Sequence, residues 1–352
     1  MQEYKTKKVF AGGVQIGGGA PVTVQSMLNI PAHDTDGNVK QAKALEKAGC
    51  DIIRVSVPDK ESVKTLAALK SNISIPVVAD IHFDYRLALE SVAAGADKIR
   101  INPGNIGADD RVKAVANACK AAGVPIRIGV NSGSLEKNIL AKYGAPTPDA
   151  MVESGLYHIS LLEKFDFDDI VLSLKSSNVV TMYNAYVLAA KKCRYPLHLG
   201  VTEAGGLRAG TVRSAIGIGS LLMSGIGDTL RVSLTADVEE EVKAGYEILK
   251  ALDLRHRGVR IISCPTCARR GYNVQQTVEE LEKRLAHITK PLTLAVMGCV
   301  VNGPGESAHA DFGVCGGKGG ENMIYVGGKP DHKVKSENIV DELVRLVEAK
   351  VS

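Results

Sequence analysis

The sequence predicts an α/β fold, a (β/α)8 TIM-type barrel followed by a smaller α/β domain. Three observations lead to this expectation. The chain has 352 residues, which suits about two domains. Short β-branched runs alternate with helical segments over roughly its first two-thirds, which is the rhythm of a barrel. That rhythm changes after the basic segment RHRG, so we expect residues 1–254 to form the barrel and residues 258–352 the smaller domain.

Eight runs are predicted to be the barrel strands: TVQSML, DIIRVSV, PVVADI, KIRINPG, PIRIGVN, DIVLSLK, LHLGVTE and TLRVSL. Three of them follow a helix-ending glycine and carry an arginine, in AGCDIIRV, AGADKIRI and AGVPIRIG, as repeated βα units would. An open doubly wound sheet is less favoured, because no GxGxxG turn follows the first strand. The glycine-rich GGVQIGGGA precedes that strand and predicts an N-terminal hairpin that closes the bottom of the barrel.

Polar side chains stand at the ends of these strands, where the active sites of barrel enzymes lie. Five of them are cations from five different strands, and they would repel one another in a partly desolvated mouth unless an anion neutralised them. A single one would simply pair with a surface carboxylate, but five at matched positions predict a small, multiply phosphorylated ligand. The predicted mouth comprises Arg54, Asp80, His82, Arg100, Asn102, Arg127, Asn131, Lys175, Arg231 and Ser233.

Glu203 closes the predicted strand that contains His198, and its position allows two interpretations. It either neutralises Arg231 on the neighbouring strand or, if it is buried with a raised pKa, donates a proton to a departing oxygen. The residues alone do not decide between these two roles.

The smaller domain is predicted to begin with the strand VRIIS, which runs into CPTC, and to continue with a helix over residues 276–287. The strand LTLAVMGC comes next. It ends before NGPGE, which we expect to be a turn that neither a helix nor a strand continues through. A strand NMIYVG and the amphipathic helix ENIVDELVRLVEAK complete the domain.

Two of these strands end on thiols, Cys264 and Cys267 in CPTC and Cys299 in MGCVV. A C-x-x-C turn with a distant cysteine is typical of a metal site, either an iron–sulfur cluster or a structural zinc. A thioredoxin-like redox pair would leave Cys299 without a role. For the fourth ligand the pattern favours Cys315, which would complete four thiolates, over Glu306, which would supply a weaker and displaceable oxygen.

Composition excludes several classes of protein. The formal net charge of +4 is too small for a general nucleic-acid binder. No apolar run approaches the roughly 20 residues of a membrane span, and MQEYKTKKVF has no signal-peptide core. Seven cysteines without secretory context argue against a disulfide framework. We therefore expect a cytoplasmic protein that binds neither membrane nor nucleic acid.

Five motifs, SCPTC, MGCVVNGPGE, RINPGN, LSLKSSN and GVTEAGG, resemble those of the 4-hydroxy-3-methylbut-2-enyl diphosphate synthases in their two-domain bacterial form. The resemblance covers essentially the whole chain, and MGCxVNGPGE is highly specific. It implies a [4Fe–4S] cluster held by Cys264, Cys267, Cys299 and Glu306, so that Cys315 is not a ligand. Ala268 departs from the glycine expected after the second cysteine.

The resemblance also implies the reaction, the two-electron reductive opening of 2-C-methyl-D-erythritol 2,4-cyclodiphosphate in non-mevalonate isoprenoid biosynthesis. One hydroxyl leaves as water, and flavodoxin or ferredoxin supplies the electrons. By resemblance, Glu203 is the proton donor, Asp80, His82, Asn102 and Asn131 line the pocket, and the diphosphate is held by Arg54, Arg100, Arg127, Lys175, Arg231 and Ser233. The alternative from another class is a zinc-stabilised barrel that binds phosphorylated ligands without redox chemistry.

The position of RHRG predicts how the protein assembles. In a barrel of this type the eighth helix runs antiparallel to the strands, so the segment after it leaves near the bottom, opposite the predicted mouth. A few linker residues do not reach back along the whole barrel. In agreement with the resemblance, we expect a two-fold homodimer in which each cluster domain caps the barrel of the other subunit.

Overall fold

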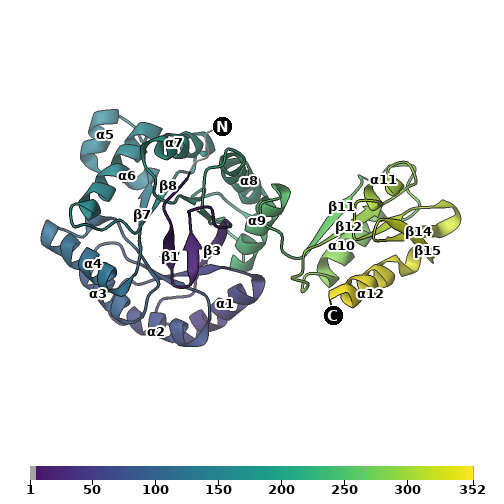
Figure 1. Cartoon of the computed structure of the whole chain (residues 1–352), viewed down its shortest axis with the longest axis horizontal. Coiled ribbons are helices and arrows are strands. Elements are labelled where there is room, and N and C mark those ends of the chain that lie inside the picture. Colours follow the sequence, from purple (N-terminus) through teal and green to yellow (C-terminus); the bar gives the residue numbers. More distant parts are fainter. Residues whose placement is uncertain (1–4, 266, 352) are drawn as a thin grey trace. The chain divides into compact units, whose positions relative to one another are not determined.

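The computed structural model of the chain describes residues 5–265 and 267–351. The chain divides into two compact units, with the boundary between Arg255 and His256 (Figure 1). Among the described residues, none of the helices is both long and apolar enough to cross a membrane.

The first unit is built around an eight-stranded parallel sheet in the order β8-β7-β6-β5-β4-β3-β10-β9. A parallel bridge between Leu172 and Leu197 joins the last strand to the first, so the sheet closes on itself. Each of the eight predicted runs contains one of these strands, which confirms the TIM-type barrel. The strands are β3 (Thr23–Met27), β4 (Ile52–Ser56), β5 (Val77–Asp80), β6 (Lys98–Arg100), β7 (Ile126–Asn131), β8 (Ile170–Lys175), β9 (His198–Leu199) and β10 (Thr229–Leu230).

Helices surround this sheet, and local chemistry fixes their ends (Figure 1). The Asp34 side chain accepts a hydrogen bond from the Gly37 N–H at the start of α1, and Gly49 ends that helix in the left-handed region, at φ 99°. The helices are α1 (Thr35–Ala48), α2 (Ser62–Asn72), α3 (Tyr85–Ala93), α4 (Asp109–Ala122), α5 (Lys137–Tyr143), α6 (Pro148–Glu163), α7 (Val179–Lys192), α8 (Leu207–Met223) and α9 (Val238–Ala251).

The predicted N-terminal hairpin is present as β1 (Val9–Ala11) paired antiparallel with β2 (Val14–Ile16). Its buried residues Val9, Ala11 and Ile16 form one apolar cluster with Ile52, Val78 and Val171 of the barrel strands. Ile52 opens β4, and Val78 and Val171 lie near the starts of β5 and β8. The hairpin therefore closes the N-terminal end of the barrel, as predicted.

The second unit is a five-stranded sheet in the order β11-β12-β13-β14-β15, parallel across its first three strands and antiparallel after them. Its elements are β11 (Val259–Ser263), α10 (Val274–Arg284), β12 (Leu292–Met297), α11 (Gly303–Ser307), β13 (Phe312–Cys315), β14 (Glu321–Val326), β15 (Lys329–Lys335) and α12 (Ile339–Val351). Helices α10 and α12 contribute Leu281 and Leu343 to an apolar core that also contains Leu294 of β12.

The structure corrects two expectations for this unit. NGPGE is not a turn that no helix continues through, because Gly303–Ser307 form the short helix α11. Pro304 lies in its first turn, where a proline is tolerated because the N–H it lacks would have no partner within the helix. The sequence reading also missed β13 and β15, which lie on either side of the predicted strand β14.

Candidate active site

A cavity of about 270 Å³ lies at the C-terminal ends of the barrel strands. Most of the residues predicted for the mouth line it, together with four that the sequence reading did not select. Its lining comprises Met27, Arg54, Asp80, His82, Arg100, Arg127, Gly129, Asn131, Ser173, Lys175, Thr202, Arg231 and Ser233. The structure therefore brings the five predicted cations into one cavity.

The alternation of side chains along the strands places these cations inside the barrel. Arg54 lies on β4, Arg100 on β6, Arg127 on β7 and Lys175 on β8, and each is at most 9% exposed. Parallel pairing sets Asp80 beside Arg100, and Arg100 beside Arg127. Neighbouring strands thus deliver charged side chains to the same level.

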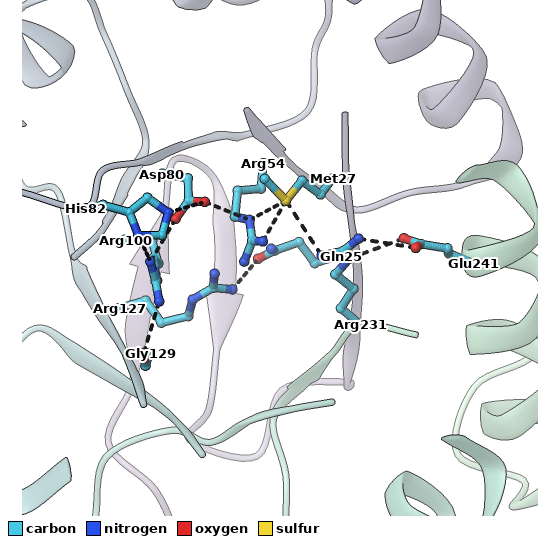
Figure 2. A network of polar contacts seen from close by, with 10 residues as sticks. All are labelled: Gln25, Met27, Arg54, Asp80, His82, Arg100, Arg127, Gly129, Arg231 and Glu241. Atoms are coloured by element: carbon cyan, nitrogen blue, oxygen red, sulfur yellow. Dashed lines mark hydrogen bonds and ion pairs between the residues drawn. The ribbon is translucent and has the colours of Figure 1, made fainter. Parts of the chain in front are cut away.

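Asp80 lies between two of the arginines (Figure 2). One of its carboxylate oxygens is 3.8 Å from Arg54 Nε, and the other is 3.4 Å from Arg100 Nη1. Burial raises the pKa of this carboxyl, but Arg54, His82 and Arg100 outweigh burial and hold the pKa well below its usual range. Asp80 is therefore an anion under ordinary conditions and offsets part of the charge of these arginines.

Arg231 pairs with Glu241 of helix α9, with two nitrogen–oxygen distances of 3.2 Å (Figure 2). Glu241 is buried and also accepts a hydrogen bond from the Ser26 hydroxyl at 2.9 Å. The Met27 sulfur accepts from Arg54 at 2.6 Å and from Arg231 at 3.6 Å. The interpretation that Glu203 neutralises Arg231 is therefore wrong, because Glu241 takes that place.

The cavity keeps an excess of positive charge. Among the residues that the structure describes, Arg127 and Lys175 form no ion pair, and the other three cations share Asp80 and Glu241. Burial lowers the pKa of Arg127, and the neighbouring Arg54 and Arg100 lower it further. The same holds for Lys175, whose pKa is lowered first by burial and then by Arg54. An oxyanion entering this cavity would relieve these repulsions.

Two predicted residues do not line the cavity. Asn102 holds the backbone of β7, since its side chain accepts from the Gly129 N–H at 2.9 Å and donates to the Gly129 carbonyl at 3.1 Å. Glu203 is exposed rather than buried and has a φ of 48°, which is uncommon for a non-glycine residue. Its carboxylate accepts from the Thr202 hydroxyl at 3.1 Å, and Thr202 itself lines the cavity.

The sequence reading missed several residues of this site. Met27, Ser173 and Thr202 line the cavity, and Glu241 and Gln25 hold Arg231 and Arg127 from outside it. Strand alternation would have found some of them, because Met27 ends the first barrel strand and Ser173 lies two residues before Lys175. Glu241 carries no such signal, since it is one of three consecutive glutamates in a helix.

The second unit places thiols at the C-terminal edge of its parallel strands. Cys264 follows β11, Cys299 follows β12, and Cys315 ends β13. The Gly298 N–H donates to the Cys264 sulfur at 3.1 Å, and the buried Cys315 thiol donates to the Cys299 carbonyl at 3.3 Å. A hydrogen bond from the Val301 backbone lowers the pKa of Cys299, and the neighbouring Arg269 side chain lowers it further. Both effects favour the thiolate form of Cys299.

Two further predicted ligands lie beside this edge. Cys267 is exposed, and Glu306 is exposed on α11, a few residues after Cys299. In the described part of the chain, no three His, Cys, Asp or Glu side chains lie close enough together to hold a single metal ion. The donor set nevertheless fits an iron–sulfur cluster, which is larger than one ion, takes thiolate ligands and is tuned by N–H groups directed at sulfur.

Comparison with known proteins identifies the family. Residues 6–246 match the GcpE TIM-barrel domain, and residues 260–349 match the GcpE protein C-terminal domain. The chain belongs to the GcpE family. Its relatives from Symbiobacterium thermophilum (55% identical, covering 100% of this chain and 95% of the relative) and Rhodospirillum rubrum (54% identical, 99% and 92%) are both named 4-hydroxy-3-methylbut-2-en-1-yl diphosphate synthase (flavodoxin).

A solved structure supports the barrel of this GcpE protein. The crystal structure of Yersinia pestis dihydropteroate synthase is similar, with a TM-score of 0.50 at 18% identity, over 70% of this chain and 98% of that one. At this identity the likeness shows the fold alone. The alternative of a zinc-stabilised barrel without redox chemistry finds no support, because the full-length relatives are named for an enzyme.

Proposed function

We propose that this GcpE protein catalyses the reductive opening of 2-C-methyl-D-erythritol 2,4-cyclodiphosphate to (E)-4-hydroxy-3-methylbut-2-enyl diphosphate. The observation that carries the proposal is the cavity in which five cations, four of them buried, lie close to two carboxylates. A cyclic diphosphate is a small ligand with several oxyanions, which this cavity would neutralise. Relatives more than half identical over nearly their full length are named for the synthase that makes this product.

In this proposal the barrel residues bind and orient the substrate. Arg54, Arg100 and Arg127 contact phosphoryl oxygens with fixed guanidinium groups, and Lys175 adds a mobile point charge. Asp80 holds Arg54 and Arg100, and Glu241 holds Arg231, before the ligand arrives, which lowers the entropy cost of binding. His82, Asn131 and Ser233 complete the lining, while Asn102 positions the strand beneath.

Glu203 is proposed as the proton donor. Its carboxyl lies on the segment that follows β9, next to the cavity residue Thr202. Its exposed position lets it exchange protons with water before the substrate covers the mouth. Departure of a hydroxyl as water needs a proton at that oxygen, which a positioned carboxylic acid supplies.

Cys264, Cys267, Cys299 and Glu306 are proposed to hold a [4Fe–4S] cluster. When bound, the cluster supplies the two electrons of the reaction one at a time. The chain contributes three thiolates, one carboxylate and the Gly298 N–H directed at the Cys264 sulfur. The relatives' names point to flavodoxin as the electron donor, with ferredoxin as the alternative.

The test is anaerobic turnover of the purified, brown protein with the cyclic diphosphate and reduced flavodoxin. We expect formation of the hydroxylated diphosphate product together with iron and sulfide in a ratio that fits one [4Fe–4S] cluster per chain. A colourless protein that contains zinc and turns over nothing would contradict the proposal. The cytoplasmic location expected from the sequence stays a prediction.

The proposal includes the homodimer predicted from the linker. Arg255, the last residue of the first unit, forms a paired contact with Asp51, with nitrogen–oxygen distances of 2.5 and 2.8 Å. Asp51 directly precedes β4, so the chain leaves the barrel at the N-terminal end of its strands, opposite the cavity. This supports a site completed by the cluster unit of a second subunit.

Complementation tests the dimer. Inactive Cys299→Ser and Glu203→Gln subunits are mixed under conditions that allow exchange. If the cluster of one subunit serves the barrel of the other, one site of each mixed dimer is intact, and up to half of the activity per dimer returns. No recovery in proven heterodimers would show that each barrel uses the cluster of its own chain.

A further inference from the structure

A layer of polar side chains lies inside the barrel, one step below the cavity. Lys98 lies two residues before Arg100 on β6, so both side chains point to the same, inner face. Lys98 is 0% exposed, and its Nζ has no hydrogen-bond partner among the described residues. His198 of β9 is equally buried, and within the same residues both of its ring nitrogens lack a partner.

Residues that line the cavity also carry unpaired polar atoms on the side of this layer. Arg127 and Ser173 line the cavity floor, and their Nε and Oγ atoms are also unpaired in the described part of the chain. Gln25 accepts from Arg127 at 3.3 Å (Figure 2). A TIM barrel usually fills its interior with branched apolar residues. Burying a polar group without a hydrogen-bond partner lowers the stability of the fold, so a layer of such groups indicates a functional role.

The charges around Lys98 are almost all positive. Burial lowers its pKa well below the ordinary value, and Arg127 and Arg54 lower it further. The pKa of His198 is likewise lowered by burial and then by Arg127, Lys175, Lys98 and Arg54. The charged groups that face this layer are Arg54 from β4, Asp80 from β5, Arg100 from β6, Arg127 from β7, Lys175 from β8 and Arg231 after β10. Of the two buried carboxylates near these cations, Asp80 is already shared by Arg54 and Arg100, and Glu241 is paired with Arg231.

We propose that Lys98 is a buried proton acceptor, which is a neutral amine in the free protein and takes up a proton from solution when an oxyanion fills the cavity above it. The inference rests on the proposed function, because it assigns a further role beneath the same diphosphate site. An entering anion cancels the repulsion from Arg54 and Arg127 and attracts an ammonium through a medium of low dielectric constant. By linkage, protonation of Lys98 then strengthens binding of the anion.

The different ordinary pKa values of lysine and histidine distinguish proton uptake by Lys98 from proton uptake by His198. At about pH 8, a histidine restored even to its ordinary pKa near 6.5 stays neutral, whereas a lysine restored toward about 10.4 is charged. Proton uptake at that pH therefore excludes His198, and the Lys98→Met variant distinguishes Lys98 from the cavity residue Lys175, whose pKa is also lowered by burial. The cyclic diphosphate and inorganic sulfate are suitable probes, because both are anions of strong acids and do not titrate near this pH.

The test is anaerobic titration calorimetry of the cluster-containing protein in buffers of different ionisation enthalpy at about pH 8, which counts the protons taken up per anion bound. We expect wild type to take up about one proton, and Lys98→Met to lose that uptake while binding the anion more weakly. His198→Gln is the matched control from the same layer, and it should keep the wild-type proton count at this pH.

The outcomes separate the two hypotheses. Failure of the cyclic diphosphate to bind wild type would overturn the proposed function, and sulfate would still report the proton count. Binding of either anion to wild type without proton uptake would overturn the role of Lys98 and leave the proposed function intact. An unchanged count in Lys98→Met would also overturn it. If Lys98→Met does not fold, Lys98→Gln replaces it, with the same expected loss.

Discussion

The cavity lined by cations in the barrel differs from the strand edge that carries Cys264, Cys299 and Cys315 in the second unit. The difference lies in how far contacts within the chain fix the side chains of each site. The cavity residues lie on or directly after closed-barrel strands, are mostly buried, and are held by Asp80, Glu241 and Met27. Two of the predicted cluster ligands, Cys267 and Glu306, are exposed and lie beyond the strand ends. The barrel holds its charged side chains in place before any ligand binds, whereas the predicted metal ligands follow the strands and would take their final geometry with the proposed cofactor.

Removing a cluster ligand is the change with the largest expected effect. Cys264→Ser, Cys267→Ser or Cys299→Ser should abolish iron binding, colour and turnover, because the thiolate is the metal ligand. Absorption spectra with iron and sulfide analysis measure this. Cys315→Ser is the matched control on the same edge and should retain iron and activity. Loss of iron in that variant would instead make Cys315 the fourth ligand and remove Glu306 from the site.

A smaller loss is expected for Glu203→Gln, which removes a proton but keeps the shape of the side chain. Turnover should fall by roughly 10²–10⁴-fold, the usual contribution of general acid catalysis. The cluster spectrum and the affinity for the cyclic diphosphate should stay close to wild type. Turnover near that of wild type would mean that Glu203 is not the proton donor.

Truncating a cavity arginine tests the barrel side of the comparison. Arg54→Ala and Arg100→Ala should each weaken substrate binding by about 1.5–3 kcal/mol, the value of a charge-assisted contact. The Michaelis constant would then rise roughly 10- to 150-fold. The control is Arg86→Ala, which removes the same charge from an exposed position on α3. Unchanged Michaelis constants in both cavity variants would contradict the phosphate-binding role.

The smallest effect concerns a carboxylate on the segment between β7 and α5. Glu136 lies 2.6 Å from His158, which accepts from the Gly104 N–H at 3.1 Å. Burial raises the pKa of Glu136, but hydrogen bonds from His158 and Ser154 outweigh burial and lower the pKa to about 2. The stabilisation of the folded protein by ionised Glu136 is present above the pKa that this group has in the unfolded chain, and it is lost as pH falls toward 2.

Glu136→Gln should therefore lower the free energy of unfolding by less than about 1 kcal/mol at neutral pH, because the group is partly exposed. Urea titrations at neutral and acid pH measure the difference. The gap between variant and wild type should shrink as pH falls below about 4, where wild-type Glu136 begins to lose its advantage. A gap that stays constant with pH would exclude the ionised carboxylate as its cause.

The strands of the barrel were predictable because each lies in a short run rich in apolar residues between helical segments, and three of these runs follow a helix-ending glycine. The second unit was harder to predict. β13 is hidden in a glycine-rich tract, and β15, KPDHKVK, is an edge strand whose charged residues do not alternate with apolar ones. The helix at Gly303–Ser307 was missed because a proline between two glycines predicts a turn, although a proline is compatible with a first helical turn.

The cations of the site were predictable because strand ends and alternation place them on one level. Their anionic partners were only partly predictable. Asp80 shares that level, but Glu241 reaches Arg231 from helix α9, and the packing of a helix on a barrel is not visible in a local pattern. Lys98 could have been found, because it lies two residues before Arg100 on the same face of β6. It was overlooked because a lysine within a strand is ordinarily read as facing solvent.

The N-terminal hairpin has a consequence for the order of events in turnover. Because its residues pack with Ile52, Val78 and Val171 at the N-terminal end of the barrel, the cavity formed by the described residues opens at the C-terminal ends of the strands. Substrate must enter and product must leave through that opening, and not through the N-terminal end of the barrel. The diphosphate product therefore has to leave before the next substrate molecule enters. Accumulated product should compete with substrate for the same opening rather than slow the enzyme from elsewhere.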